Sequence, residues 1–137
     1  MGFDAEMTTT LVYGLAVAGR AVASELVSRG ESVILVDDLE SESNAEFALQ
    51  LKSEIQFRPT AAEIAALLHK SDRVVPAPGL PESHQLFDAS RRLQKPVMSE
   101  IELAYQIEQQ SSAPRPMVAV TGTDGKTTTT LMAAAIL

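Results

Sequence analysis

Several residue types are missing from this sequence or scarce in it, and each shortage excludes a kind of function. Cysteine is absent from all 137 residues, which excludes disulfides, thiol catalysis and cysteine-bound metal and fits a reducing, cytoplasmic location. Basic residues are outnumbered, since 11 Lys and Arg stand against 18 Asp and Glu for a formal net charge of −7. Such a chain repels nucleic acid and anionic membranes, so we expect its partners to be small molecules or proteins.

Histidine and long apolar runs are also scarce. The two histidines, His69 and His84, share no metal-ligand spacing with carboxylates, so we expect both at the surface and no zinc site or Ser-His-Asp triad. No apolar run approaches the length that crosses a bilayer. The first ten residues carry Asp4 and Glu6 but no Lys or Arg. This pattern argues against a signal peptide. Met7 could be a second start, which would leave residues 1–6 as a frayed tail.

The composition that remains is that of a folded protein. Hydrophobic residues make up 45% and charged residues 21% of the chain, as in globular proteins rather than disordered ones. The length is enough for one domain with a real core and too short for two domains of ordinary size.

A glycine- and threonine-rich loop near the end of the chain carries the strongest motif. Residues 121–127 read TGTDGKT and lie between an apolar run at 117–120, which predicts a strand, and residues 128–137, which predict a helix. This is the layout of a P-loop, in which backbone N–H groups surround a phosphate, the lysine adds a mobile charge and the next hydroxyl reaches Mg²⁺. Val120 stands where the strict pattern has its first glycine, and a plain surface loop is the alternative. The order of strand, loop and helix favours phosphate binding.

A second glycine-containing turn lies near the start of the chain. A strand is expected at residues 10–13, followed by the turn GLAVAG at 14–19, a helix to about residue 29 and a strand at 32–36 that ends in Asp37 and Asp38. This β-α-β unit directs the N-terminus of its helix at a ligand. Ala16 replaces the second glycine of the dinucleotide pattern G-x-G-x-x-G, which disfavours a nicotinamide dinucleotide. Asp37 falls where such domains contact a ribose, although a helix cap or a solvated turn explains either acid equally well.

The following segments continue the alternation of helices and strands. Helices are expected at residues 44–52, 60–70, 83–94 and 99–109, with capping boxes at 60–63 and 99–102, and strands at 54–57, 72–75 and 96–98. The loop PAPGLP at 76–81 follows the carboxyl end of a strand, where open α/β sheets bind ligands. A stiff turn is the equal alternative for this loop. The polar, proline-rich residues 110–116 form the best linker candidate.

The whole pattern predicts an α/β fold in two parts. Residues 1–112 are expected to form a Rossmann-like parallel sheet flanked by helices, and residues 113–137 the first strand and P-loop of a truncated second, ATPase domain. A lone strand and helix bury too little surface to offset their ordering entropy. Either this segment stays mobile beyond the linker at 114–116, or it buries the apolar helix face of Leu131, Met132, Ala135, Ile136 and Leu137 against its own domain or a second copy. We favour burial, because the exposed face would otherwise promote aggregation, and burial against a second copy would be self-association.

These segments, in their order and spacing, resemble the Mur ligases. The resemblance is carried by residues 14–20, 36–37, 76–81, 99–104 and 118–127. It covers nearly the whole chain from about Thr9 to Leu137, yet only about the first third of such an enzyme. The block EIEL at 100–103 favours the members that add D-glutamate over those that add L-alanine.

The resemblance implies a reaction of peptidoglycan synthesis in the cytoplasm. ATP would phosphorylate the carboxylate of UDP-N-acetylmuramoyl-L-alanine, and the amine of D-glutamate would attack the acyl phosphate to form an amide. ATP and Mg²⁺ are the implied cofactors, and the first domain would hold the UDP end of the substrate. The P-loop would act through electrostatics and positioning.

The resemblance also implies the site residues. Lys126 would neutralise the β- and γ-phosphates and Thr127 would ligate Mg²⁺, which makes these two the catalytic residues. The ATP-binding residues would be Thr121, Gly122, Thr123, Asp124, Gly125, Lys126, Thr127 and Thr128. The UDP-binding residues would be Gly14, Val17, Ala18, Gly19, Asp37, Asp38, Pro78 and Gly79.

This sequence departs from the family at a few of these positions. Ala16 replaces a usual glycine, Ala18 a usual serine or threonine, Ala77 a usual serine and Asp124 a usual asparagine, so we expect weaker ligand binding. Two other functions stay open: an NAD-binding regulatory module, which would prefer NADH to a uridine nucleotide, and a non-catalytic interaction domain, which would bind no nucleotide. We expect the chain alone to be inactive as a ligase and as an ATPase.

Overall fold

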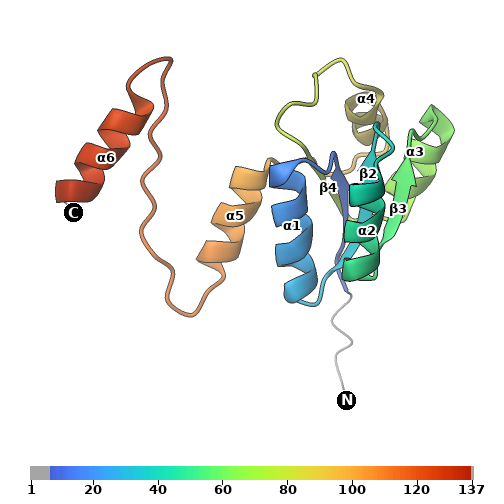
Figure 1. Ribbon diagram of the computed structural model, residues 1–137, viewed down its shortest axis with the longest axis horizontal. Helices are drawn as coiled ribbons and strands as arrows, with labels where there is room; N and C mark the ends of the chain where they lie inside the picture. Colours follow the sequence, from blue (N-terminus) through green and yellow to red (C-terminus); the bar gives the residue numbers. More distant parts are fainter. Residues whose placement is uncertain (1–6, 137) are drawn as a thin grey trace. The chain divides into compact units, whose positions relative to one another are not determined.

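The computed structural model describes residues 7–136. A four-stranded parallel sheet forms the centre of the first of its two units (Figure 1). Its strands are β1 (Thr9–Tyr13), β2 (Ser32–Asp37), β3 (Glu54–Phe57) and β4 (Arg73–Pro76), in the order β3-β2-β1-β4. All three neighbouring pairs are parallel, which confirms the predicted α/β class. Residues 1–6, for which a frayed tail and no signal peptide were expected, lie outside the described residues. Leu137 lies outside them too.

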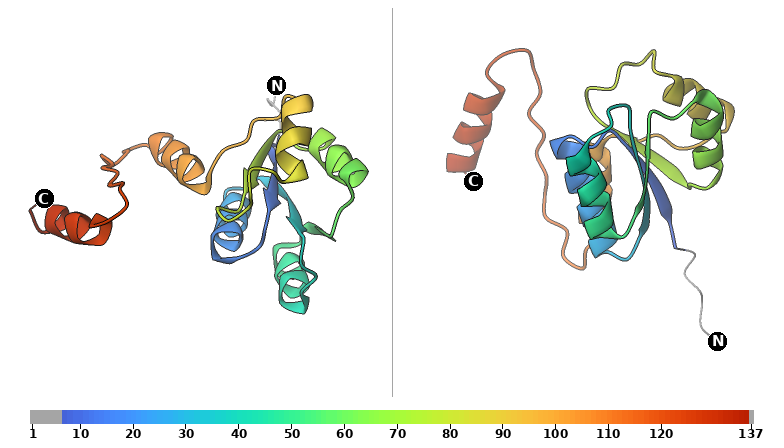
Figure 2. Two further views of the ribbon diagram at one scale, coloured as in Figure 1. Left: turned by 90° about the horizontal axis from the view of Figure 1, so that it is seen from above. Right: turned by 45° about the vertical axis from the view of Figure 1, so that its right-hand side comes forward.

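Helices cover both faces of this sheet (Figure 2). On one face lie α1 (Val17–Ser28) and α2 (Glu42–Leu51), and on the other lie α3 (Ala61–His69) and α4 (Gln85–Arg92). Side chains alternate along a strand, so each strand serves both faces. The α3/α4 side holds a core of Leu11, Tyr13, Ile34, Val36, Ile64, Leu67, Leu68, Val74 and Leu86. Parallel strands buried on both faces are hydrophobic almost throughout, as the burial of β1 and β2 shows.

The predicted capping boxes mark the true starts of two helices. The Thr60 side chain accepts from the Glu63 N–H and the Glu63 carboxylate accepts from the Thr60 N–H, so the first box is complete. At the second, the Glu102 N–H donates to Ser99 Oγ, and α5 (Glu100–Gln109) begins there. These local patterns placed both helix starts to within a residue.

The strand predicted at residues 96–98 is reduced to a single bridge. Val74 donates to the Pro96 carbonyl at 2.8 Å and accepts from the Met98 N–H at 3.0 Å, and Val97 is the bridge partner. Pro96 lacks an N–H, so the segment cannot continue a ladder beside β4.

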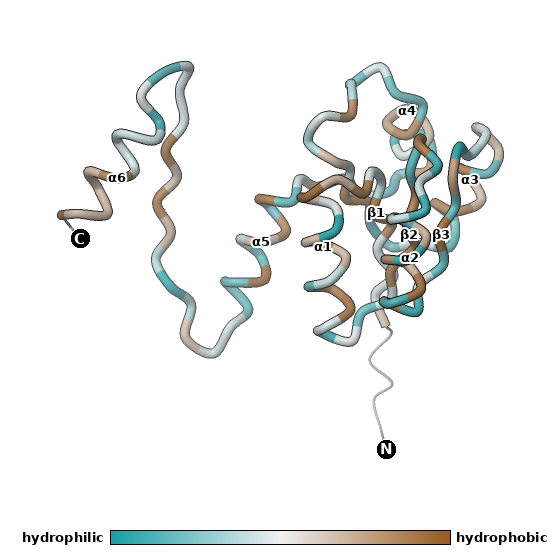
Figure 3. The backbone as a smooth tube through the Cα atoms, in the orientation of Figure 1, coloured by the Kyte–Doolittle hydropathy of each residue, from teal (hydrophilic) through white to brown (hydrophobic). Residues whose placement is uncertain are grey.

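The chain divides into two units, the first ending at Tyr105 and the second beginning at Gln106. In the second unit, the strand predicted at 117–120 is wrong: these residues are extended but belong to no strand. The apolar run is visible before α6 (Lys126–Ile136) in Figure 3. A strand needs a hydrogen-bonded neighbour, and the described residues pair none with it.

The last helix, α6, begins at Lys126 rather than at the predicted Thr128. Its large apolar side chains are open to solvent in the single chain, with Leu131 66%, Met132 60% and Ile136 81% exposed. None of the helices described here has both the length and the apolarity required to cross a bilayer.

Candidate functional site

The glycine turn after β1 is packed too tightly for side chains. Gly14 has a φ of +92°, and a Cβ on it would lie 2.6 Å from Ala77 Cβ. A Cβ on Gly19 would lie only 1.9 Å from the Gly14 carbonyl oxygen. Both glycines are therefore required by close approach and, at Gly14, by a backbone region that L-residues rarely adopt.

The loop after β4 lies against this glycine turn, as predicted from the shared edge of the sheet. The Ala77 N–H donates to the Tyr13 carbonyl at 2.7 Å, and the Gly14 N–H donates to the Val36 carbonyl at 2.7 Å. The ends of β1, β2 and β4 are thus tied together where open α/β sheets bind ligands. The predicted UDP-binding positions Gly14 to Gly19, Asp37 and Asp38 and the Pro78-Gly79 loop all lie at this edge.

The N-terminus of α1 lacks the side-chain cap that the other sheet-covering helices have. Ala16 occupies the N-cap position without a side-chain hydrogen bond, and the first turn carries no acid. By contrast, Ser41, Thr60 and His84 cap α2, α3 and α4. The first backbone N–H groups of a helix carry a partial positive charge, so this end of α1 can accept an anion.

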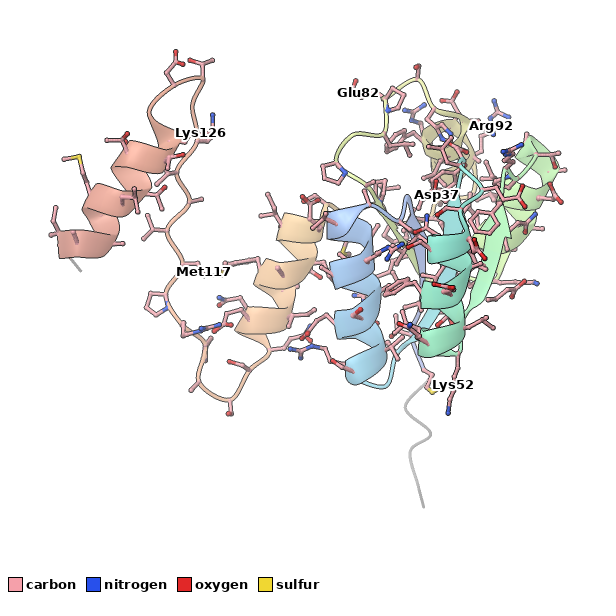
Figure 4. The ribbon with its side chains drawn as sticks, viewed as in Figure 1. Asp37, Lys52, Glu82, Arg92, Met117 and Lys126 are labelled. Carbon is pink, nitrogen blue, oxygen red and sulfur yellow. The ribbon has the colours of Figure 1, made fainter. Side chains whose placement is uncertain are left out.

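Asp37 holds the glycine turn in place. Its Oδ2 accepts from the Leu15 N–H at 2.7 Å and from Asn44 Nδ2 at 3.3 Å, and its Oδ1 accepts from the Leu39 N–H at 2.9 Å. Figure 4 shows Asp37 at the end of β2. The Asp37 carboxylate therefore holds the backbone of the glycine turn and of the segment after β2. This is the structural role that was the alternative to ribose contact.

Arg20 is a site residue that the sequence did not identify. Its Nη2 donates to Ser43 Oγ at 2.7 Å and Asn44 Oδ1 at 2.6 Å, and its Nε donates to the Leu15 carbonyl at 3.2 Å. Its guanidinium also lies over the Phe47 ring, 5.1 Å from the centroid. Arg20 makes no ion pair with the residues that the structure describes, so its hydrogen bonds tie the glycine turn to α2. The one sequence signal was its place directly after Gly19.

His84 is not a surface residue, and that prediction is wrong. Its side chain is 14% exposed, with Nε2 3.2 Å from Asp38 Oδ2, and its ring meets that of Tyr13 edge-on at 5.0 Å. The Tyr13 hydroxyl donates to Asp38 Oδ1 at 2.7 Å. Burial, with the Asp38 carboxylate beside it, raises the pKa of Tyr13 well above its ordinary value. His84 is drawn inward because α4 needs a cap, and its Nδ1 accepts from the Leu86 N–H at 3.2 Å. His69 is exposed, as predicted.

The predicted P-loop belongs to the second unit. Gly122 and Gly125 have φ values of +151° and +75°, and α6 begins directly after Gly125. Lys126 Nζ donates to the carbonyls of Gly122 at 2.5 Å and Thr123 at 3.4 Å. Residues 121–130 are exposed. The loop therefore reverses direction at its two glycines, and the Lys126 ammonium group is hydrogen-bonded to carbonyl oxygens of the same loop. A bound phosphate could compete for that ammonium group.

The second unit fits a phosphate better than it fits a metal ion. Mg²⁺ prefers octahedral oxygen ligands that include carboxylates. No group of three or more His, Asp or Glu side chains in the described part of the chain could hold a metal ion. Thr127 supplies at most one hydroxyl ligand, so these residues do not form a magnesium site by themselves.

Comparisons with known proteins identify relatives for nearly the whole chain. No protein-family model matches it. A UDP-N-acetylmuramoylalanine–D-glutamate ligase from Bacillus cytotoxicus is 36% identical over 130 residues, which are 94% of this chain and 28% of the relative. The protein of the same name from Geotalea daltonii is 38% identical over 126 residues, 92% of this chain and 27% of the relative.

A solved structure supports the same relationship. The UDP-N-acetylmuramate-alanine ligase from Thermotoga maritima has a TM-score of 0.62 and 26% identity, over 95% of this chain and 29% of that chain. The chain spans about a quarter of the length of the curated relatives that it matches.

Proposed function

This chain is related to the Mur ligases, and from that premise we propose that it forms the domain that binds the UDP end of UDP-N-acetylmuramoyl-L-alanine. The complete ligase would join D-glutamate to this substrate through an ATP-derived acyl phosphate. The observation that carries the proposal is the 36–38% identity to enzymes named for this reaction. The proposal for the chain itself is narrower: it binds, and it does not catalyse.

The geometry of the first unit supports diphosphate binding. The N–H groups of Val17 and Ala18 lie in the first turn of α1, which has neither a side-chain cap nor an acid. Anions bind well at such a helix end. Gly14 brings the turn close to Ala77, and the Pro78-Gly79 loop that follows Ala77 would hold the ligand from the other side. Asp37 and Asp38 would then stand beside the ribose and uracil.

A titration followed by ¹H–¹⁵N NMR tests this proposal on the whole chain. UDP at millimolar concentration should shift the amides of residues 15–19 and of Ala77, Gly79 and Leu80, and NADH should bind more weakly. No shift with UDP would contradict the proposal. Preference for NADH would favour the dinucleotide-binding module, and no nucleotide binding at all would favour the interaction domain.

A matched pair of variants locates the ligand. Val17→Glu places a carboxylate at the first position of α1, where Val17 is 88% exposed, and should abolish UDP binding without unfolding the protein. Ala61→Glu makes the same kind of change at the first position of α3, where the residue is also exposed. That variant should bind UDP as the wild type does. Equal affinity in both variants would place the ligand elsewhere.

For the second unit, we propose ATP binding at residues 121–128 in the complete ligase. Lys126 would leave the carbonyls of Gly122 and Thr123 for the β- and γ-phosphates, and Thr127 would contribute a hydroxyl to Mg²⁺. Among the described residues, no group of three or more His, Asp or Glu side chains could hold the metal ion. The chain by itself should therefore release no phosphate from ATP. Release above background that Lys126→Ala abolishes would refute this.

Self-association is the proposed consequence of the exposed face of α6. Leu131, Met132 and Ile136 are each 60–81% exposed, and soluble proteins usually bury such a patch. Sedimentation velocity should detect a dimer that Leu131→Glu dissociates. A monomer at all concentrations would contradict it. We also propose a cytoplasmic location, where UDP-linked precursors are made.

A further inference from the structure

The loop between β4 and α4 is attached to Tyr13 at both of its ends. At its start, the Ala77 N–H donates to the Tyr13 carbonyl at 2.7 Å. At its finish, the His84 ring meets the Tyr13 ring edge-on at 5.0 Å. Between these points the described backbone has two internal bonds, from Leu80 to Ala77 at 3.0 Å and from His84 to Pro81 at 2.9 Å. Tyr13 is also the last residue before the glycine turn, so both walls of the crevice depend on it.

Asp38 connects this arrangement to the end of β2. Its Oδ1 accepts from the Tyr13 hydroxyl at 2.7 Å, and its Oδ2 lies 3.2 Å from His84 Nε2. Tyr13 is 1% exposed and the His84 side chain 14% exposed. Three elements that are distant in sequence are therefore joined by one carboxylate at the crevice. Figure 4 shows Glu82 on the loop and Asp37, the neighbour of Asp38, at the same edge.

Each ring nitrogen of His84 faces a partner. Nδ1 accepts from the Leu86 N–H at 3.2 Å and therefore carries no proton. Nε2 lies 3.2 Å from Asp38 Oδ2. Because both ring nitrogens are engaged, His84 has no free nitrogen with which to act as a general base. Its role is to position other groups.

We propose that Tyr13, Asp38 and His84 form a latch, which fixes the 77–84 loop opposite the glycine turn and so sets the affinity of the crevice for its nucleotide. The latch itself is a property of the free protein, whereas its effect on affinity rests on the proposed function. A loop that is held before the ligand arrives loses less conformational freedom on binding. Loss of the latch should therefore free the loop and weaken binding together.

Two substitutions of His84 separate the latch from the helix cap. His84→Asn puts an amide oxygen where Nδ1 lies, which keeps the cap, but its side chain is too short to reach Asp38. His84→Gln puts an amide N–H near the place of Nε2, which keeps a donor beside Asp38, but it gives up the cap. Both variants lose the ring that meets Tyr13, so they differ only in the contact with Asp38 and in the cap. The His84→Asn variant should keep nearly the stability of the wild type and lose the latch, and the His84→Gln variant should do the reverse.

Motion of the loop can be measured without any ligand. The amides of Gly79, Leu80 and Glu82 report on it, because Pro78 and Pro81 have no N–H. In His84→Asn, ¹⁵N order parameters and hydrogen-exchange protection at these amides should fall, while His84→Gln keeps them. Thr60→Ala serves as the control, since it removes only the cap of α3. Unchanged order in His84→Asn would overturn the proposal.

Affinity for UDP is then measured on the same four proteins. His84→Asn should bind UDP about tenfold more weakly than the wild type, and His84→Gln and Thr60→Ala about equally to it. If the wild type binds no UDP but the loop order follows the expected pattern, the proposed ligand is wrong and the latch stands. If the wild type binds UDP and His84→Asn matches it in both affinity and loop order, the latch is wrong and the ligand stands.

Discussion

Replacing Gly19 with alanine should destabilise the first unit, although alanine is the better helix former. In a helix interior, alanine is favoured over glycine by about 1 kcal/mol. Against this gain, the new Cβ would lie 1.9 Å from the Gly14 carbonyl oxygen and 3.0 Å from the Gly14 carbonyl carbon. Both atoms belong to the backbone, so no side-chain rotation relieves the overlap.

The size of the loss follows from what must move. Overpacking of a close-packed site costs roughly 1–3 kcal/mol, and here Gly14 is also hydrogen-bonded to Val36 and packed beside Ala77. Relief of the overlap must separate α1 from the end of β1, so we place the cost at the upper end of that range. After subtraction of the helix gain, the net destabilisation is about 1–2 kcal/mol, which lowers Tm by about 4–16 °C in a unit of this size.

Thermal and urea unfolding followed by circular dichroism measure this change. Gly79→Ala is the matched control, because a Cβ at Gly79 meets no heavy atom within 4 Å. That variant should be neutral or more stable by up to about 1 kcal/mol, since alanine restricts the unfolded chain. A midpoint for Gly19→Ala at or above that of the wild type would refute the close approach of the helix to the glycine turn.

Three further predictions concern ionisation and mobility. Hydrogen bonds from Thr60 lower the pKa of Glu63 below its ordinary 4.5. The charged Glu63 side chain therefore stabilises the folded protein fully above pH 4.5, and this stabilisation is lost as the pH falls through the folded-state pKa. Unfolding curves of the wild type and Glu63→Ala should differ at pH 7 and converge in acid. Burial and then the hydrogen bond to Asp38 raise the pKa of Tyr13 above its ordinary 10.0. The neutral Tyr13 hydroxyl therefore stabilises the folded protein fully below pH 10.0, and this stabilisation is lost as the pH rises. The wild type should lose its advantage in unfolding free energy over Tyr13→Phe in alkali, and an advantage that grows there would contradict the raised pKa. Residues 118–120 lie in no strand, so their amides should exchange with little protection in monomeric protein, and strong protection would mean that they pair.

The sequence predicted those elements whose signals are local. The capping box at Thr60 and Glu63 fixes the start of α3 within four residues of chain, and the apolar run of β2 ends directly at its acids. The strands predicted at 96–98 and 117–120 failed for a different reason. A β-strand forms only beside a second strand with which it can exchange hydrogen bonds, and the hydrophobicity of a segment does not reveal whether such a strand is present.

The sequence predicted where the candidate site lies but not the side-chain hydrogen bonds that hold it together. The edge shared by the glycine turn and the Pro78-Gly79 loop follows from strand order and direction, both of which the β-α-β pattern contains. The bond between Arg20 and Asn44 spans 24 residues, and that between Tyr13 and Asp38 spans 25. Neither has a sequence spacing that a motif records. His84 was misplaced because its capping role depends on where α4 begins.

The adjacent acids Asp37 and Asp38 hold different segments at the carboxyl end of the sheet. Successive side chains at a strand end point to opposite faces of the sheet, and here Asp37 binds Leu15 and Asn44 on the α1/α2 side. Asp38 binds Tyr13 and His84 on the α3/α4 side, where Tyr13 joins the core of Ile64 and Leu86. One strand end therefore sets the position of the glycine turn and of the opposing loop relative to each other. Each acid therefore has a structural role at this edge that does not depend on contact with a ligand.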